Sequence, residues 1–365
     1  MIDFDLSDDQ QAVREAVEKF ARDEVRPAAR AAEEAQEVPP HLLRAFADFG
    51  FTRALLPAEF GGAGETRSIL TGAVVAEALA WGDMAIALHG LSSHLLALPI
   101  LEWGSPAQRR QFLPRLAQSD FQPGAAAWME PRFDFDLSAI SLSASPNGDG
   151  AVLNGDKCCV PLAAQAETIV VLASDPRRAL QLWLVPRQTP GLKLGERERK
   201  MGLNGLATYS LHMENCRVPA AALLGEGQAC DFARLVAQSR VALAAMGVGL
   251  ARAAFEYARD YARERRAFGA PIATRQAIAF MLAEMAIEVD AARLLVWEAA
   301  VGLDHGRDRS KEAYLARDYV ADAALKIADN AVQILGGHGY VRDHPVELWL
   351  RNARGLISFE GLALV

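Results

Sequence analysis

Apolar residues recur at helical spacing near the start of the chain, where charged residues fill the positions between them. Between Asp8 and Ala35 the apolar stripe contains Val13, Ala16, Val17, Phe20 and Val25. Such spacing is typical of an amphipathic helix, and Ser7 is placed to cap its first turn. Pro39-Pro40 ends the pattern. The sequence therefore predicts a first helix over about 8–35.

Further helical patterns follow up to residue 117. Short helices are expected at 41–49, 67–80 and 107–117, with a glycine-rich turn at 60–64 between the first two. The run 84–101 carries no charged residue and is just long enough to cross a bilayer. It also contains two histidines and a proline, so we expect a buried core helix and no membrane span.

The pattern changes near Gly124, after which short apolar runs are separated by Gly, Asn and Asp. Strands are predicted at 151–153, 168–172, 180–185 and 208–213. Alternation and turn residues together indicate an antiparallel β domain of barrel or sandwich type.

After Gly227 the pattern is helical again. Long helices are predicted at 231–264, at 274–303 with Thr274 as the N-cap, and at 310–335, where Gly336-Gly337 provide the stop. A short helix and a tail are expected at 343–360. Long helices joined by short loops favour a bundle.

The order of these elements predicts an α+β multidomain protein. We expect an N-terminal helical domain at 1–122, a central antiparallel β domain at 123–228 and a C-terminal four-helix bundle at 229–365. The 365 residues are 51% hydrophobic and 23% charged, with a formal net charge of −8. This composition excludes a disordered chain and argues against nucleic acid as a partner. The acidic start Met1-Ile-Asp-Phe-Asp does not resemble a signal peptide, so we expect a cytoplasmic location.

The sequence shows no metal-binding or phosphate-binding motif. The seven histidines lack metal spacing, and neither a GxGxxG turn nor a P-loop is present. The cysteines are Cys158, Cys159, Cys216 and Cys230. The adjacent pair could form a disulfide only under severe strain, so all four are expected to be reduced thiols.

Several motifs resemble those of the acyl-CoA dehydrogenase family, in the family's order and over the whole chain. The matching stretches are Tyr261–Ile272 with Arg275–Ile278, Ala331–Tyr340, Pro345–Arg354, Leu153–Lys157, Lys200–Leu203, Arg217–Pro219 and Leu224–Glu226. One such stretch alone is a weak signal, but the ordered set is specific. The resemblance implies the fold predicted above, with FAD as the cofactor.

The resemblance also implies which residues bind FAD. They are Arg265, Phe268, Gln276, Gln333, Gly336 and Gly337, together with Met129 at a position that normally bonds the flavin. A guanidinium suits a pyrophosphate, and glycine lets a ligand approach the backbone. Some of these positions reach the cofactor of a neighbouring subunit, so a homotetramer or homodimer is expected, or else a hetero-oligomer.

The stretch Ser358-Phe-Glu360-Gly resembles the family's catalytic motif. By this resemblance Glu360 removes the α-proton of an acyl thioester while the β-hydrogen leaves as hydride to flavin N5. Arg240 matches an arginine near this glutamate, and Phe135 matches a position near the CoA moiety. The substrate is expected to be an acyl-CoA or an acyl-carrier thioester, and an electron-transfer-flavoprotein-type acceptor takes the electrons.

Some residues depart from the family pattern where flavin and thioester are expected to meet. Met129 and Pro161 stand where the family has hydroxyl groups, Cys159 replaces an aromatic residue, and Phe135 replaces a serine. Three interpretations therefore stay open. The chain is a divergent dehydrogenase, a flavin-poor homologue or subunit that does not turn over, or a flavin monooxygenase on the same scaffold. A catalytic Glu360 favours the first.

Overall fold

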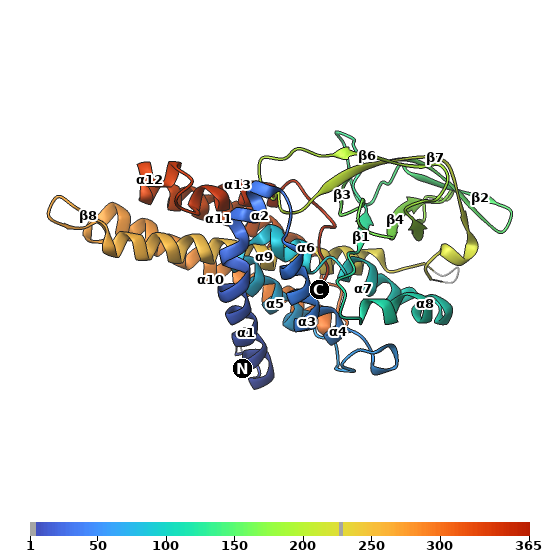
Figure 1. Cartoon of the computed structure of the whole chain (residues 1–365), viewed down its shortest axis with the longest axis horizontal. Helices are drawn as coiled ribbons and strands as arrows, with labels where there is room; N and C mark the ends of the chain where they lie inside the picture. The colour runs from blue at the N-terminus through green and yellow to red at the C-terminus, as the bar shows by residue number, and fades with distance from the viewer. Residues whose placement is uncertain (1–4, 226–228) are drawn as a thin grey trace.

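The N-terminal third is helical in the computed structural model, which describes residues 5–225 and 229–365 (Figure 1). The helices are α1 (Asp8–Phe20), α2 (Arg26–Ala35), α3 (Pro40–Phe49), α4 (Phe51–Leu55), α5 (Ile69–Gly82), α6 (Met84–Gly90), α7 (His94–Trp103) and α8 (Pro106–Leu116). A π-helical segment, Ala21–Val25, joins α1 to α2. Ser7 caps α1 as predicted, in a capping box with Gln10.

The apolar run 84–101 is buried as expected, but the prediction of one helix is wrong. The chain breaks at residues 91–93 and bends by 44° between α6 and α7. At the end of α6, a Cβ on Gly90 would lie 2.1 Å from the ring of Phe46. Gly90 thus allows the end of α6 to pack directly on the Phe46 ring, a contact with a distant part of the chain that the local sequence does not show.

Within the described residues the central strands form one seven-stranded sheet in the order β1-β4-β2-β3-β7-β6, with β5 beside β4. The strands are β1 (Ala125–Ala127), β2 (Ser143–Asn147), β3 (Gly150–Pro161), β4 (Thr168–Ser174), β5 (Leu180–Pro186), β6 (Leu192–Arg197) and β7 (Thr208–Pro219). The sheet is mostly antiparallel, but β1 runs parallel to β4 and β2 meets β4 in one parallel bridge. The expectation of purely antiparallel pairing is corrected at these two contacts.

The C-terminal third consists of long helices that extend into an arm (Figure 1). They are α9 (Phe232–Glu264), α10 (Gln276–Asp304), α11 (Ser310–Leu335), α12 (Gly337–Tyr340) and α13 (Val346–Leu356), with a small hairpin of β8 (Arg266–Ala267) and β9 (Ala270–Pro271). Gly336 ends α11 with φ +59°, as predicted. Thr274 is not the N-cap of α10, because the helix begins at Gln276 and Arg275 is its N-cap. The Thr274 hydroxyl donates instead to the carbonyl of Pro271.

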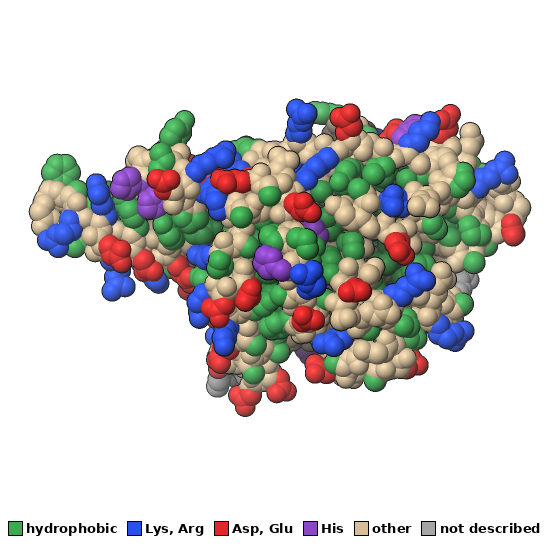
Figure 2. Space-filling view, in the orientation of Figure 1, with side chains coloured by type: hydrophobic (Ala, Val, Ile, Leu, Met, Phe, Trp, Pro, Cys, Tyr) green, Lys and Arg blue, Asp and Glu red, His purple; other side chains and the backbone are tan. Residues whose placement is uncertain are grey.

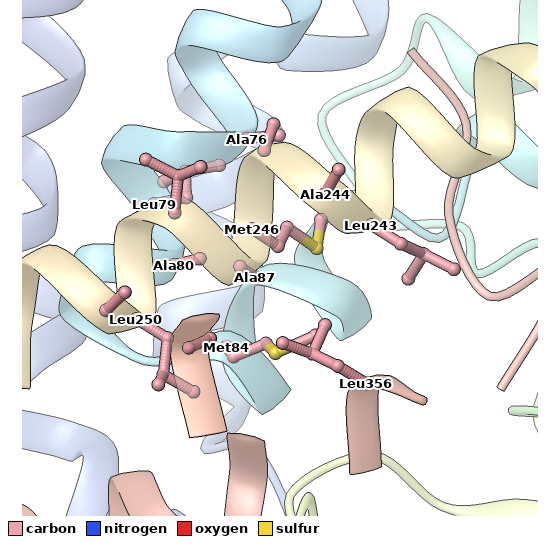
Figure 3. Packing of buried hydrophobic residues seen from close by; sticks show 14 of the residues in the cluster. Ala76, Leu79, Ala80, Met84, Ala87, Leu243, Ala244, Met246, Leu250 and Leu356 are labelled. Carbon is pink, nitrogen blue, oxygen red and sulfur yellow. The ribbon is translucent and has the colours of Figure 1, made fainter. Parts of the chain in front are cut away.

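Two apolar clusters form the core. The first joins α1–α6 to α9, α10, α11 and α13; Figure 3 shows Leu79, Met84, Met246, Leu250 and Leu356 meeting around α9. The second joins α7, α8 and the sheet to the first turn of α9. The division between the clusters falls at the α6–α7 bend. The predicted boundaries at residues 122 and 228 stay predictions; residues 226–228, which include Glu226 of one motif, lie outside the described part.

Charged side chains of both signs cover the visible surface. Figure 2 shows acidic and basic side chains interspersed over one face. One described helix, α9, is long and apolar enough to cross a membrane by length and composition, and the bent α6–α7 pair passes the same test as a unit. Most of the apolar stretch of α9 is buried inside the protein.

Among the described residues no cluster of three potential metal ligands occurs.

Candidate active site

Glu360 lies in the loop that follows α13, between guanidinium groups from two other helices. Its Oε1 atom is 3.4 Å from Nε and from Nη2 of Arg240 on α9. Nε of Arg317 on α11 lies 3.6 Å from the same oxygen. Oε2 is buried and has no hydrogen-bond partner among the described residues. One carboxylate oxygen is therefore held in place, while the other remains available for a further proton or ligand.

Arg317 was not singled out from the sequence. Its Nη2 donates to the carbonyls of Leu356 (2.9 Å) and Phe359 (2.5 Å), so it holds the loop as well as the carboxylate. Ala313, Ala316 and Val320 around it are buried. The sequence did contain one signal that could have identified Arg317, since it is a single arginine on an otherwise apolar helix face. A buried guanidinium needs hydrogen-bond partners, and here they come from another part of the fold.

The backbone of Glu360 is fixed by the segment that follows β1. Its N–H donates to the sulfur of Met129 over 3.3 Å. The next residue, Gly361, has φ +72°, and a Cβ there would lie 2.5 Å from the Trp128 ring. Glycine is thus required both by backbone conformation and by the close approach. The structure brings Met129, Arg240 and Glu360 together. The resemblance implied that Arg240 lies near Glu360, but it gave Met129 only as a flavin contact.

A buried ion pair between Lys157 and Glu130 holds the backbone next to Met129. Nζ of Lys157 donates to the Trp128 carbonyl (3.0 Å) and to Oε1 of Glu130 (3.1 Å). Burial lowers the pKa of Lys157 to about 8, although Glu130 opposes the shift. Burial alone would raise the pKa of Glu130, but Lys157 and backbone donors bring it below its ordinary value. With its partners in place the pair fixes the backbone at residues 128–130.

The tail 361–365 is buried between the helical blocks. The carbonyl of Leu364 lies 3.2 Å from Nδ1 of His94 on α7. Nη2 of Arg67 donates to the carbonyl of Val365 at 2.6 Å. Burial lowers the pKa of His94 to about 4. Contacts on both sides of the tail thus anchor the loop that carries Glu360.

Apart from Met129, the residues expected to bind FAD lie elsewhere in this chain. Arg265, Phe268, Gln276, Gln333, Gly336 and Gly337 are all exposed at the end of the arm, near β8, β9 and α12 (Figure 1). Arg240 and Arg265 are 25 residues apart along α9, which corresponds to roughly 38 Å. One chain therefore does not unite this group with Glu360. Phe135 is half-buried and packs against the second core cluster.

Comparisons with known proteins match this geometry to one family. The N-terminal, middle and C-terminal domain models of acyl-CoA dehydrogenases match residues 7–120, 125–216 and 231–363. The chain belongs to the acyl-CoA dehydrogenase family. The family's members are oxidoreductases that act on CH–CH bonds.

Individual relatives are similar over nearly the full length. The chain is 35% identical to an acyl-CoA dehydrogenase of Bacillus subtilis, covering 98% of this chain and 95% of the relative. It is 34% identical to the human mitochondrial short-chain specific acyl-CoA dehydrogenase, covering 98% and 88%. The structure of butyryl-CoA dehydrogenase from Megasphaera elsdenii superposes with a TM-score of 0.89 at 30% identity, covering 97% and 95%.

The exposed residues at the end of the arm have the chemistry that FAD requires. A Cβ added at Gly269, Gly336 or Gly337 would meet nothing within 4 Å, so a ligand can approach the backbone there. The Arg265 side chain has no polar partner within the described ranges 5–225 and 229–365. A free guanidinium beside accessible backbone suits a pyrophosphate. This donor set fits the cofactor, provided that it faces a second chain.

Proposed function

We propose that this chain is an FAD-dependent acyl-CoA dehydrogenase that introduces a Cα–Cβ double bond into an acyl thioester, with Glu360 as the base. One observation carries the proposal: a half-buried carboxylate held through one oxygen by Arg240 and Arg317, with its second oxygen unpartnered. This arrangement gives a base a fixed direction and leaves one oxygen for the substrate proton.

Each contact to Glu360 has a separate role in this mechanism. Arg240 and Arg317 hold the carboxylate, so its orientation is set before the substrate binds. The hydrogen bond to the Met129 sulfur and the close packing of Gly361 on Trp128 fix the backbone. Oε2 then accepts the α-proton. FAD, when bound, supplies the acceptor for the β-hydride, and a separate flavoprotein takes the electrons onward.

We infer that the cofactor is shared between copies of the chain. Arg265, Gln333 and the glycines 336 and 337 would hold the FAD of a neighbouring subunit, because they project from the end of the arm. Phe268, 95% exposed, would reach the same cofactor. Met129 belongs to the Glu360 side of the shared site.

An apolar face on the arm supports self-association. Phe280, Ile287, Leu294 and Val301 recur every seven residues on α10 and are 60%, 67%, 42% and 39% exposed. This seven-residue repeat is the spacing by which one helix packs along another. A hollow of about 680 Å³ beside it is lined by Leu294, Val301 and Tyr319, away from Glu360. A homodimer or homotetramer covers this face.

The first experiment is the visible absorbance spectrum of the purified chain, followed by anaerobic addition of butyryl-CoA. A flavin spectrum that bleaches with the thioester is the expected result. A protein that stays colourless after incubation with excess FAD contradicts the proposal and favours a flavin-poor subunit. That alternative draws support from Met129 and Pro161, which offer the flavin no hydroxyl group. A parallel sample with the same acyl group on a carrier protein tests the second substrate class.

A further inference from the structure

Cys158 and Cys159 lie in a bulge of β3, outside the regular pairing with β7. Lys157 pairs with Leu211 and Val160 pairs with Tyr209, whereas neither cysteine has a partner in the register. Cys159 has a left-handed backbone, with φ +55°. Both side chains are half-buried free thiols. The strand therefore presents two adjacent sulfurs at an irregular and partly accessible point.

The bulge is directly connected to the loop of the candidate base. The N–H of Cys158 donates to the Met129 carbonyl over 3.0 Å. The sulfur of Met129 accepts from the N–H of Glu360. The N–H of Cys159 is held by Oε1 of Glu198, also over 3.0 Å. A change in the bulge backbone must therefore disturb Met129, Glu198 or both.

The two thiols have different acid–base character. A hydrogen bond from Cys159 lowers the pKa of Cys158; burial and Glu198 oppose this shift, and the nearby Lys157 ammonium supports it. The same hydrogen bond, together with burial, raises the pKa of Cys159. Of the two thiols, Cys158 is therefore the one that ionises more readily, and Cys159 is the thiol beside it. A partly accessible thiolate next to a second cysteine is the arrangement of a peroxide-reactive pair.

We propose that Cys158 and Cys159 form a redox-modification site that hydrogen peroxide closes reversibly to a vicinal disulfide. The Cys158 thiolate attacks a peroxide oxygen and the O–O bond breaks, which forms a sulfenic acid and a hydroxide. The hydroxide takes up the proton that Cys158 lost on ionising and leaves as one water. The Cys159 sulfur then attacks the Cys158 sulfur, the S–O bond breaks, and a second water leaves. The two thiols lose two electrons and two protons in total, which reduce one peroxide to two waters.

The strain expected for adjacent cysteines makes this disulfide labile. Neighbouring Cα atoms are about 3.8 Å apart, below the usual lower limit of about 4.4 Å for a relaxed disulfide. A strained disulfide is easily reduced, so a thiol reductant reopens it. Closing it also shifts the backbone that holds Met129. The expected fall in turnover on oxidation rests on the proposed function of Glu360, whereas the modification itself does not.

The test treats the full-length protein with hydrogen peroxide and measures intact mass, free thiols and turnover on the same samples. We expect the loss of two of the four thiols, a mass lower by two hydrogen atoms, and one peptide containing both oxidised cysteines. Dithiothreitol reverses all three changes. A Cys216→Ser/Cys230→Ser control behaves in the same way, while Cys159→Ser stops at a sulfenic acid on Cys158 that dimedone labels.

Other outcomes overturn the inference in distinguishable ways. A gain in mass from added oxygen, without the loss of two hydrogen atoms, contradicts the disulfide. A Cys216→Ser/Cys230→Ser control that forms no disulfide contradicts it as well. A disulfide that leaves turnover unchanged contradicts the link to Glu360. A protein that is inactive even when reduced contradicts the proposed function, while its mass spectrum still decides whether the pair is a modification site.

Discussion

At the scale of single residues, the chemistry depends on one carboxylate oxygen being held while the other stays open. Arg240 and Arg317 come from different helices, and both approach Oε1 of Glu360. An amide at position 360 would keep nearly the same shape but could not accept the α-proton. Replacing the carboxylate by an amide is therefore expected to change the rate of catalysis without changing the stability of the fold.

We expect Glu360→Gln to retain its flavin absorbance and its unfolding transition, but to bleach with an acyl thioester at least about 100-fold more slowly, because the general base is lost. Stopped-flow absorbance under anaerobic conditions measures the rate. Glu34→Gln, an exposed position on α2, is the matched control and should bleach at the normal rate. Equal rates in the two variants would rule out Glu360 as the base.

At the scale of elements, the loop 357–361 and the tail are held by contacts from every part of the chain. Gly361 combines a positive φ with an approach to Trp128 that leaves no room for a side chain. Gly148 has a similar φ of +61°, but an added Cβ there would meet nothing within 4 Å. Alanine at Gly148 therefore tests the cost of the backbone conformation alone, whereas alanine at Gly361 tests that cost together with the clash against Trp128.

We expect Gly361→Ala to lower the free energy of unfolding by about 3 kcal/mol, because a left-handed alanine and a clash with the ring both act against it. Gly148→Ala, the matched control, carries only the backbone cost of about 1 kcal/mol. Chemical denaturation of both variants measures the difference. Equal losses would mean that the tail adapts around the methyl group.

The buried histidine on α7 predicts a pH dependence of stability. The pKa of His94 is lowered from 6.5 to about 4 by burial, so between these values the unfolded chain binds the proton and the folded chain does not. The free energy of unfolding therefore falls as pH drops from 6.5 to 4, by about 3 kcal/mol for this group. Asp83, whose pKa burial raises to about 6, contributes a slope of opposite sign.

His94→Gln should flatten this dependence, because the group that takes up the proton is gone. Denaturation at several pH values between 4 and 7 measures the slope in both proteins. A variant whose slope matches the wild type would assign the acid sensitivity to other groups, such as His89, whose pKa burial also lowers to about 4.

At the scale of the whole molecule, the proposed function makes the arm one half of an interface between copies of the chain. The apolar face of α10 consists of exposed residues that recur every seven positions: Phe280, Ile287, Leu294 and Val301. The expected FAD-binding residues lie on the same arm. Solvent-exposed apolar rows of this length are unusual on a protein that remains monomeric. Association would both cover this face and bring a neighbour's donors to the cofactor.

We expect Ile287→Asp/Leu294→Asp to shift the protein to a smaller assembly and to lose bound FAD, because the buried face becomes charged. Light scattering gives the mass and visible absorbance gives the flavin content. Phe133→Asp, fully exposed on the β domain, is the control that should leave both unchanged. A variant of unchanged mass would place the interface elsewhere.

Local periodicity predicted most of the long elements, because it lies within short windows of sequence, whereas the proximity of Arg240 to Glu360 was implied only by the resemblance to the family. Three features depended on distant contacts. The end of α6 packs on the distant Phe46, and β1 is three alanines that become a strand only beside β4. Arg317 acts through carbonyls about 40 residues away in the chain. The sequence alone contains no distance information that would reveal them.

The division of the core at residues 91–93 has a consequence for how the molecule opens. Helices α7 and α8 share their apolar cluster with the sheet, whereas α1–α6 share theirs with α9, α10, α11 and α13. Cooperative units follow shared cores more closely than they follow order along the chain. In native-state hydrogen exchange, amides of α7 should therefore exchange together with those of β4, and amides of α5 together with those of α9. The N-terminal helices would then unfold as parts of two units that divide within the α6–α7 bend.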